Sequence, residues 1–216
     1  MVLPILLLTS NAGQVLQPKM HLNEEHLYKV NSVEKDFAGP SDKLSRSIVQ
    51  GMPIQITAVK IQGGSTSVRV VTGPLVVRGR SVGRSKTNTF DVDSVNSWNG
   101  TPYALVGVVF PPGGAKQGQA WVAPFRGSPP LTAGLTATYK LMKTQTQGGQ
   151  KVAFLSVSVR GDNSCRTRGS GQLIVGEGDG IVRSGKLHFD IAFMRPGKGK
   201  TMVVNSHDGL DYTITQ

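Results

Sequence analysis

The sequence predicts a mainly β protein, built as an antiparallel meander, a curved sheet or a half-barrel, with two similar lobes as one possible division. Three observations lead to this fold class. Short apolar segments alternate with polar residues at a period of two, which is typical of half-buried strands. Gly, Pro, Asn and Asp separate these segments. After residue 50 no helical pattern intervenes, which disfavours a parallel sheet with crossover helices.

The alternation is clearest in two segments, 153–160 and 187–194, where every second residue is apolar. In chain order, strands are expected at 24–34, 53–62, 65–72, 75–80, 86–93, 103–109, 119–124, 134–143, 153–160, 171–176, 187–194, 201–205 and 211–215. Asp208-Gly209 is typical of a hairpin turn and is expected to join the last two. Ser41 to Val49 could form two helical turns or a loop.

The first twelve residues resemble an export signal. Val2 to Leu8 is a short apolar run, and Ser10 and Ala12 match the small-x-small pattern of a cleavage site, with cleavage expected after Ala12. No Lys or Arg precedes the run. The alternative is a buried N-terminal strand. Residues 1–12 therefore predict an exported protein, located in the periplasm, in the cell envelope or outside the cell.

A weak internal repeat divides the rest of the chain. Gln62-Gly63-Gly64 and Gln147-Gly148-Gly149 each separate two expected strands, as a β-hairpin would require. The segment 111–130 is rich in Pro and Gly, which favours a junction. The sequence thus predicts an N-terminal half, 13–110, and a C-terminal half, 131–216, which could also form one continuous domain. Duplication and chance similarity both remain open as explanations of the repeat.

Composition limits the classes of protein. The chain of 216 residues has 24 Lys and Arg against 13 Asp and Glu, a formal net charge of +11, and one Cys. A single Cys excludes an intramolecular disulfide and a Cys-rich zinc site. Cys165 lies in a polar, basic stretch that is expected to be a loop. No apolar run reaches the ~18 residues that a transmembrane helix needs.

The strongest functional signal is the distribution of charge. Residues 43–90 and 94–161 contain several Lys and Arg and no acid, so a positive surface that attracts anions is expected. The densest cluster, and the predicted anion-binding patch, is Arg78, Arg80, Arg84 and Lys86. Anionic lipid, glycolipid or acidic polysaccharide would suit an exported protein. Nucleic acid is the alternative partner, disfavoured because aromatic residues are only 6% and none interleaves this cluster.

Motifs for catalysis are not found. His21 and His26 flank two Glu but lack metal-ligand spacing. They are better explained as polar surface residues before the first strand. Asp91 and Asp93 would share one face of a strand. This spacing is explained without catalysis if both residues simply face solvent. We therefore predict a non-enzymatic protein without cofactor or metal, which binds an amphiphilic or anionic envelope ligand. A basic nucleic-acid-binding or capsid-type β protein is the first alternative, and a hydrolase that uses Asp91, Asp93 or Asp190 is the second.

Several motifs also resemble those of a group of uncharacterised exported bacterial β-proteins, domains of unknown function. They are Pro111-Pro112, the pattern Lys116-x-Gly118-x-x-Trp121, Tyr139-Lys140-Leu141 and the following Gly-Gly hairpin. The resemblance extends over about residues 24–215. It implies a curved antiparallel sheet and an envelope or secreted location, and it supplies no catalytic residues.

Overall fold

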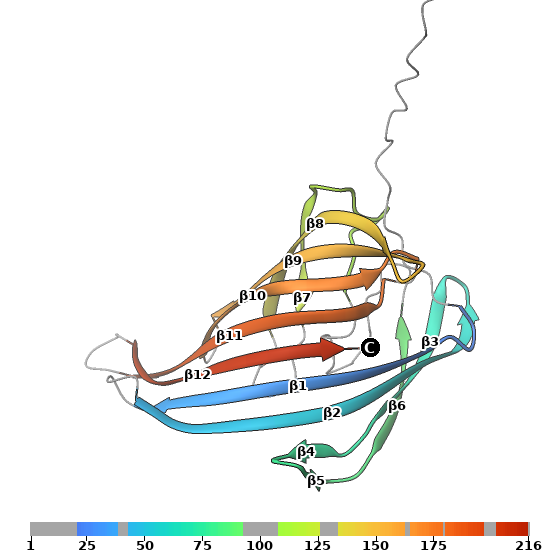
Figure 1. Ribbon diagram of the computed structural model, residues 1–216. Coiled ribbons are helices and arrows are strands. Elements are labelled where there is room, and N and C mark those ends of the chain that lie inside the picture. Colours follow the sequence, from blue (N-terminus) through green and yellow to red (C-terminus); the bar gives the residue numbers. More distant parts are fainter. Residues whose placement is uncertain are drawn as a thin grey trace, which may run out of the picture.

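The computed structural model shows one large antiparallel sheet and describes residues 21–38, 43–92, 108–125, 134–162, 165–178, 180–196 and 202–215 (Figure 1). Every regular element among these residues is a strand. The strands are β1 (Glu25–Ala38), β2 (Lys43–Gln62), β3 (Ser65–Thr72), β4 (Leu75–Val77), β5 (Arg80–Val82), β6 (Lys86–Val92), β7 (Ala120–Phe125), β8 (Leu135–Gln147), β9 (Gln150–Asp162), β10 (Cys165–Gly176), β11 (Val182–Pro196) and β12 (Met202–Thr215).

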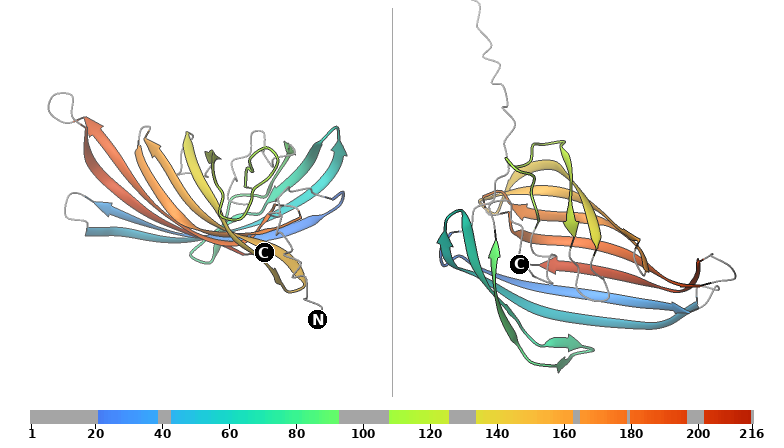
Figure 2. Two further views of the ribbon diagram at one scale, coloured as in Figure 1. Left: turned by 90° about the horizontal axis from the view of Figure 1, so that it is seen from above. Right: turned by 180° about the vertical axis from the view of Figure 1, so that it is seen from behind.

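The sheet is open and curved, as the sequence predicts. Its strand order is β5-β4-β2-β1-β12-β11-β10-β9-β8-β7, and β3 pairs with the far end of β2 and with β6. Seen from above, the long strands bend together into a trough (Figure 2). Because β1 and β12 pair along ten residue positions, the first and last strands lie side by side in the middle of the sheet.

One face of the sheet carries the core. Alternate residues on nearly every long strand are buried, among them Ile56, Leu155, Phe189 and Ile214. On this face Trp121, the second residue of β7, stacks between Phe110 and Tyr139 of β8. The ring centroids of Trp121 and Phe110 are 5.7 Å apart, and those of Trp121 and Tyr139 are 5.5 Å apart. The indole Nε1 of Trp121 donates a hydrogen bond to the carbonyl oxygen of Val109 at 2.8 Å, so the buried ring keeps a polar partner.

Within the described strands, bulges interrupt the pairing at five places. The register shifts after Asp36, Ala58, Leu141, Ile174 and Phe193. At each of these places one strand carries an extra residue, which bends the strand and increases its twist. Bulges spread over several strands therefore account for a sheet that curves as a whole.

Two sequence expectations about strands are wrong. Asp208-Gly209 is not a turn, because β12 continues through it from Met202 to Thr215 with β1 on one side and β11 on the other. The neighbouring strands on both sides provide partners for the backbone N–H and C=O groups there, and this pairing outweighs the local turn preference. The expected helix or loop at 41–49 is a strand from Lys43 onward, since β2 pairs with β1 from there.

Smaller differences follow the same pattern. The expected strand 75–80 is the hairpin of β4 and β5, which turns at Arg78-Gly79. Cys165 begins strand β10 and is not in a loop. Most of the expected strand 103–109 lies outside the described residues. Both Gln-Gly-Gly segments do form turns, between β2 and β3 and between β8 and β9. Among the described residues there is no helix long and apolar enough to cross a membrane.

Candidate functional site

The described residues form two hollows of ligand size, one polar and one mainly apolar. The polar cavity has a volume of about 570 Å³ and lies where the tip of the β8–β9 hairpin meets β1 and β11. Its polar lining residues are Glu24, Glu25, His26, Gln147, Gln150, Arg183 and Ser184. Val152 and Ile174 add an apolar part to the wall.

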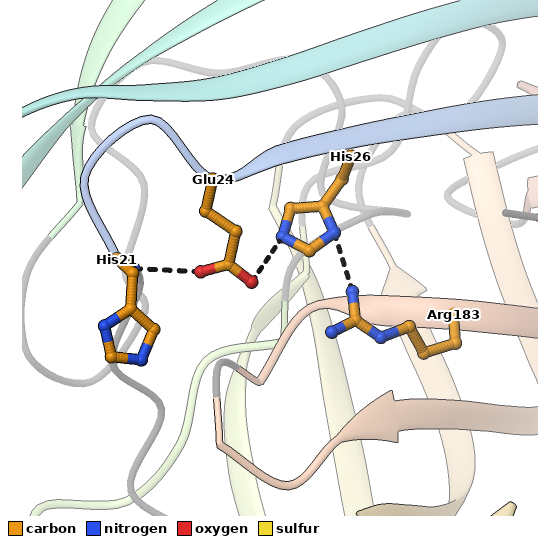
Figure 3. A network of polar contacts seen from close by, with 4 residues as sticks. All are labelled: His21, Glu24, His26 and Arg183. Atoms are coloured by element: carbon orange, nitrogen blue, oxygen red, sulfur yellow. Dashed lines mark hydrogen bonds and ion pairs between the residues drawn. The ribbon is translucent and has the colours of Figure 1, made fainter. Parts of the chain in front are cut away.

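A chain of polar contacts runs along the wall of this cavity (Figure 3). Arg183 Nη1 lies 2.7 Å from His26 Nδ1, and His26 Nε2 lies 3.0 Å from Glu24 Oε1. The other carboxylate oxygen of Glu24 accepts a hydrogen bond from the backbone N–H of His21 at 2.9 Å. A guanidinium can only donate, so the Nδ1 atom of His26 accepts and the neutral ring carries its proton on Nε2.

The topology explains why these residues meet although His26 and Arg183 are 157 positions apart. Thr215 of β12 pairs with Lys29 of β1 and with Ser184 of β11. β1 and β11 flank β12 and therefore lie two strand widths apart, about 9–10 Å. The side chains of His26 and Arg183 bridge that interval.

A bulge supplies the arginine. Ile174 pairs with Ser184 and Val175 pairs with Val182, which leaves Arg183 as the extra residue of β11. Bulges re-aim side chains and are common beside functional sites. The long side chain of Arg183 extends from β11 toward β1, as Figure 3 shows.

The structure corrects the interpretation of His26. The sequence predicts a polar surface residue, but His26 is buried, with 4% of its surface exposed. It alternates with Leu27 and lies on the same face as Tyr28 and Val30, which places it on the core side of β1. His21, by contrast, is exposed as expected. Both ring nitrogens of His26 face protein groups, so the ring orients Glu24 and Arg183.

The second hollow is a groove of about 390 Å³ on the opposite face of the sheet, between β1, β2 and the β4–β5 hairpin. Val49, Met52, Pro53 and Val76 form its apolar part. Lys29 and Arg78 carry the charges in its lining. Gly51 lies among them, and a Cβ there would come 3.1 Å from Asn31 Oδ1. The missing side chain of Gly51 therefore helps to leave this part of the sheet face open.

Arg78 adopts an unusual backbone conformation at the turn of the hairpin. Its φ is 50° and that of Gly79 is 77°, as in a type I′ turn. Asn or Gly is preferred at the first of these positions, and a long side chain there costs of order 1 kcal/mol. Arginine thus occupies this position against a local preference, and it lines the groove.

The other three residues of the predicted patch lie on the same part of the sheet. Arg80 begins β5, Arg84 lies between β5 and β6, and Lys86 begins β6. All four basic residues of the patch are exposed. Of these four, only Arg78 lines the groove, so the structure distinguishes its position from those of its neighbours.

Carboxylates gather elsewhere in two small groups. Glu34, Asp36 and Asp208 are half-buried and hold oxygen atoms within 4.8 Å of one another, a spacing that suits a metal ion but does not by itself indicate one. Gln50 Nε2 donates to Glu34 Oε2 at 3.2 Å. Asp91 is exposed and accepts a hydrogen bond from Ser67 Oγ at 2.7 Å. Asp93 lies outside the described residues.

Asp190 belongs to a second group, around His188 on the outer face. His188 Nδ1 lies 2.7 Å from Asp211 Oδ1, and Nε2 lies 3.4 Å from Asp190 Oδ1. The hydrogen bond with Asp211 raises the pKa of His188, and the nearby negative charges add to this effect. With 53% of the His188 side chain exposed, this is a surface ion pair on the outer face of the sheet.

Comparisons with known proteins add little to this picture. No family model matches the chain, and no curated protein matches it. Among solved structures, DynF from the dynemicin biosynthesis pathway of Micromonospora chersina aligns over 94% of this chain and 85% of its own, with 9% identity and a TM-score of 0.27. A likeness at that level carries no argument about fold or function.

Proposed function

We propose that this protein is an exported, non-enzymatic binding protein that holds an anionic amphiphile in the groove between β1, β2 and the β4–β5 hairpin. One observation carries the proposal. An apolar groove of about 390 Å³ has two cations, Lys29 and Arg78, in its lining. An acyl chain would remove apolar surface from water there, at roughly 25 cal/mol per Å² buried. A charged head group would pair with Lys29 or Arg78.

Three further observations support it. Arg78 occupies a backbone conformation that Asn or Gly would adopt more easily, which favours a role for its side chain. The chain carries a formal net charge of +11, and Arg80, Arg84 and Lys86 extend the positive surface beyond the groove. The apolar run Val2–Leu8, followed by Ser10 and Ala12, supports export.

The test compares two lipids that share an acyl chain and differ in head group. Lysophosphatidylglycerol is anionic and lysophosphatidylcholine is zwitterionic, and both are titrated below their micelle concentrations into the full-length protein. Isothermal titration calorimetry is expected to show one bound lysophosphatidylglycerol per chain and binding of lysophosphatidylcholine that is at least about tenfold weaker, since a tenfold difference needs only ~1.4 kcal/mol.

Two matched variants separate the groove from the general positive field. Arg78→Asn removes one of the two positive charges in the groove and suits the turn, so the protein should fold at least as well while affinity falls about 5–10-fold. Arg80→Asn removes the same charge outside the groove and should change affinity by less than about twofold. Equal losses in both variants would show attraction by the whole surface and would refute a groove site. Gly51→Leu, which fills the groove, should abolish binding.

A further inference from the structure

The polar cavity differs in chemistry from the groove. Its charged lining residues are two acids, Glu24 and Glu25, and one base, Arg183, in a chain that otherwise has a large excess of basic residues. Anions attracted by the rest of the surface therefore meet no excess of positive charge here. A ligand of this cavity belongs to a different class from the ligand of the groove.

Two of the three charges in the wall, those of Glu24 and Arg183, offset each other. His26 contacts Arg183 at 2.7 Å and Glu24 at 3.0 Å, so the guanidinium and the carboxylate balance each other through the ring. Glu25 Oε1 accepts a hydrogen bond from Gln55 Nε2 at 2.9 Å. Gln55 is neutral and leaves the charge of Glu25 in place, but Glu25 is exposed and water screens that charge, so the wall offers a ligand mainly hydrogen-bonding capacity.

Amide and hydroxyl groups complete the lining. Gln147 and Gln150 pair with each other on either side of the Gly148-Gly149 turn, and Ser184 of β11 lines the cavity with them. Each amide presents a donor and an acceptor side by side, which matches adjacent hydroxyl groups on a ring. Val152 and Ile174 supply an apolar surface against which the C–H face of such a ring could pack.

We propose that the cavity formed by β1, β11 and the β8–β9 hairpin binds a neutral, polyhydroxylated ligand, a sugar or cyclic polyol. The volume of about 570 Å³ lies within the usual ~300–1,000 Å³ range of ligand pockets and admits one or two sugar rings. The buried His26 holds Arg183 and Glu24 in place, so this part of the wall is formed before the ligand arrives. The site is independent of the groove.

The experiment is a saturation-transfer difference NMR screen of the full-length protein against glucose, galactose, mannose, N-acetylglucosamine, maltose, trehalose and myo-inositol, with titration calorimetry of those that respond. Putrescine and inorganic phosphate serve as charged probes. At least one of the neutral compounds is expected to bind at millimolar affinity or tighter, and both charged probes are expected to bind at least about tenfold more weakly. If none of the neutral compounds binds, or if a charged probe binds more tightly than all of them, the proposal is wrong.

Variants locate the binding. Gln150→Ala and Ser184→Ala each remove a lining group and should lower the affinity for the sugar about 3–10-fold, in keeping with the loss of one hydrogen bond. Gln145→Ala is the control, because Gln145 lies on the same hairpin, is exposed and does not line the cavity. Equal affinity in all three variants would place the sugar elsewhere and overturn the proposal. Lysophosphatidylglycerol binding should be unchanged in all three, so failure of either proposal leaves the other testable.

Discussion

At the scale of single residues, His188 shows how a surface group can make stability depend on pH. Its Nδ1 atom lies 2.7 Å from Asp211 Oδ1, and this contact is strongest when the ring is protonated and donates to the carboxylate. The pKa of His188 is raised in the folded state, chiefly by this contact. The contribution is therefore fully present below the unfolded pKa, near ~6.5, and is lost as the pH rises through the folded pKa.

We predict that His188→Gln reduces the difference in unfolding free energy between about pH 5.5 and about pH 8.5. The change should stay below about 1 kcal/mol, because the pair is exposed and solvent screens it. Urea denaturation at the two pH values measures the free energies. Histidine Cε1–H NMR titration gives the pKa of His188 directly, and Asp211→Asn should lower that pKa more than Asp190→Asn does. An equal effect of the two substitutions would contradict the assignment to Asp211.

At the scale of elements, β10 depends on glycines that let its neighbour approach closely. Gly169 and Gly171 lie opposite Phe189 and Leu187 of β11. A Cβ on Gly171 would collide with the backbone oxygen of Lys186 and would come 2.9 Å from Leu187 Cα. A backbone neighbour cannot move aside as the end of a side chain can, so the strands would have to separate locally.

Gly171→Ala is accordingly expected to destabilise the protein by about 2–3 kcal/mol. Gly178→Ala serves as the control, since Gly178 lies in the β10–β11 turn with open space around its Cβ position and no positive φ, and its effect should stay within about 0.5 kcal/mol. Denaturant midpoints of the two variants give the comparison. Similar midpoints would mean that β10 and β11 adjust to the extra atom.

The elements also show how far the sequence alone can lead. Period-two alternation correctly predicts the strands at 153–160 and 187–194, because one buried face imposes that pattern on the sequence. Asp208-Gly209 predicts a turn wrongly, because turn preference is local and pairing with β1 and β11 is not. The Arg183–His26 contact could not be predicted either. It depends on the pairing of β12 with both β1 and β11 and on a bulge in β11, and neither leaves a signal in the sequence near those residues.

At the scale of the whole molecule, β12 determines whether the chain behaves as one unit. It joins β1, from the N-terminal part of the chain, to β11, from the C-terminal part. The buried core cluster likewise includes residues from the first strand to the last, from Tyr28 of β1 to Ile214 of β12. Strands from both predicted halves thus share one sheet and one core, which favours a single cooperative unfolding transition even though chains above ~150 residues often deviate from it.

A substitution in β12 tests whether distant parts of the sheet unfold together. Leu210 is fully buried in the middle strand, and Leu210→Ala should cost about 2–5 kcal/mol. Trp121 lies in β7, at the far end of the strand order. With Trp98→Phe as the background, fluorescence reports on Trp121 alone, while far-UV circular dichroism reports on the sheet. If the sheet unfolds as one unit, Leu210→Ala shifts both midpoints by the same denaturant increment.

Thr213→Ala is the control, on the opposite face of β12. It should shift neither midpoint by much, because its side chain is not part of the core. A Trp121 midpoint that stays in place while the circular dichroism curve splits would instead show two lobes that unfold separately, with β12 belonging to only one of them.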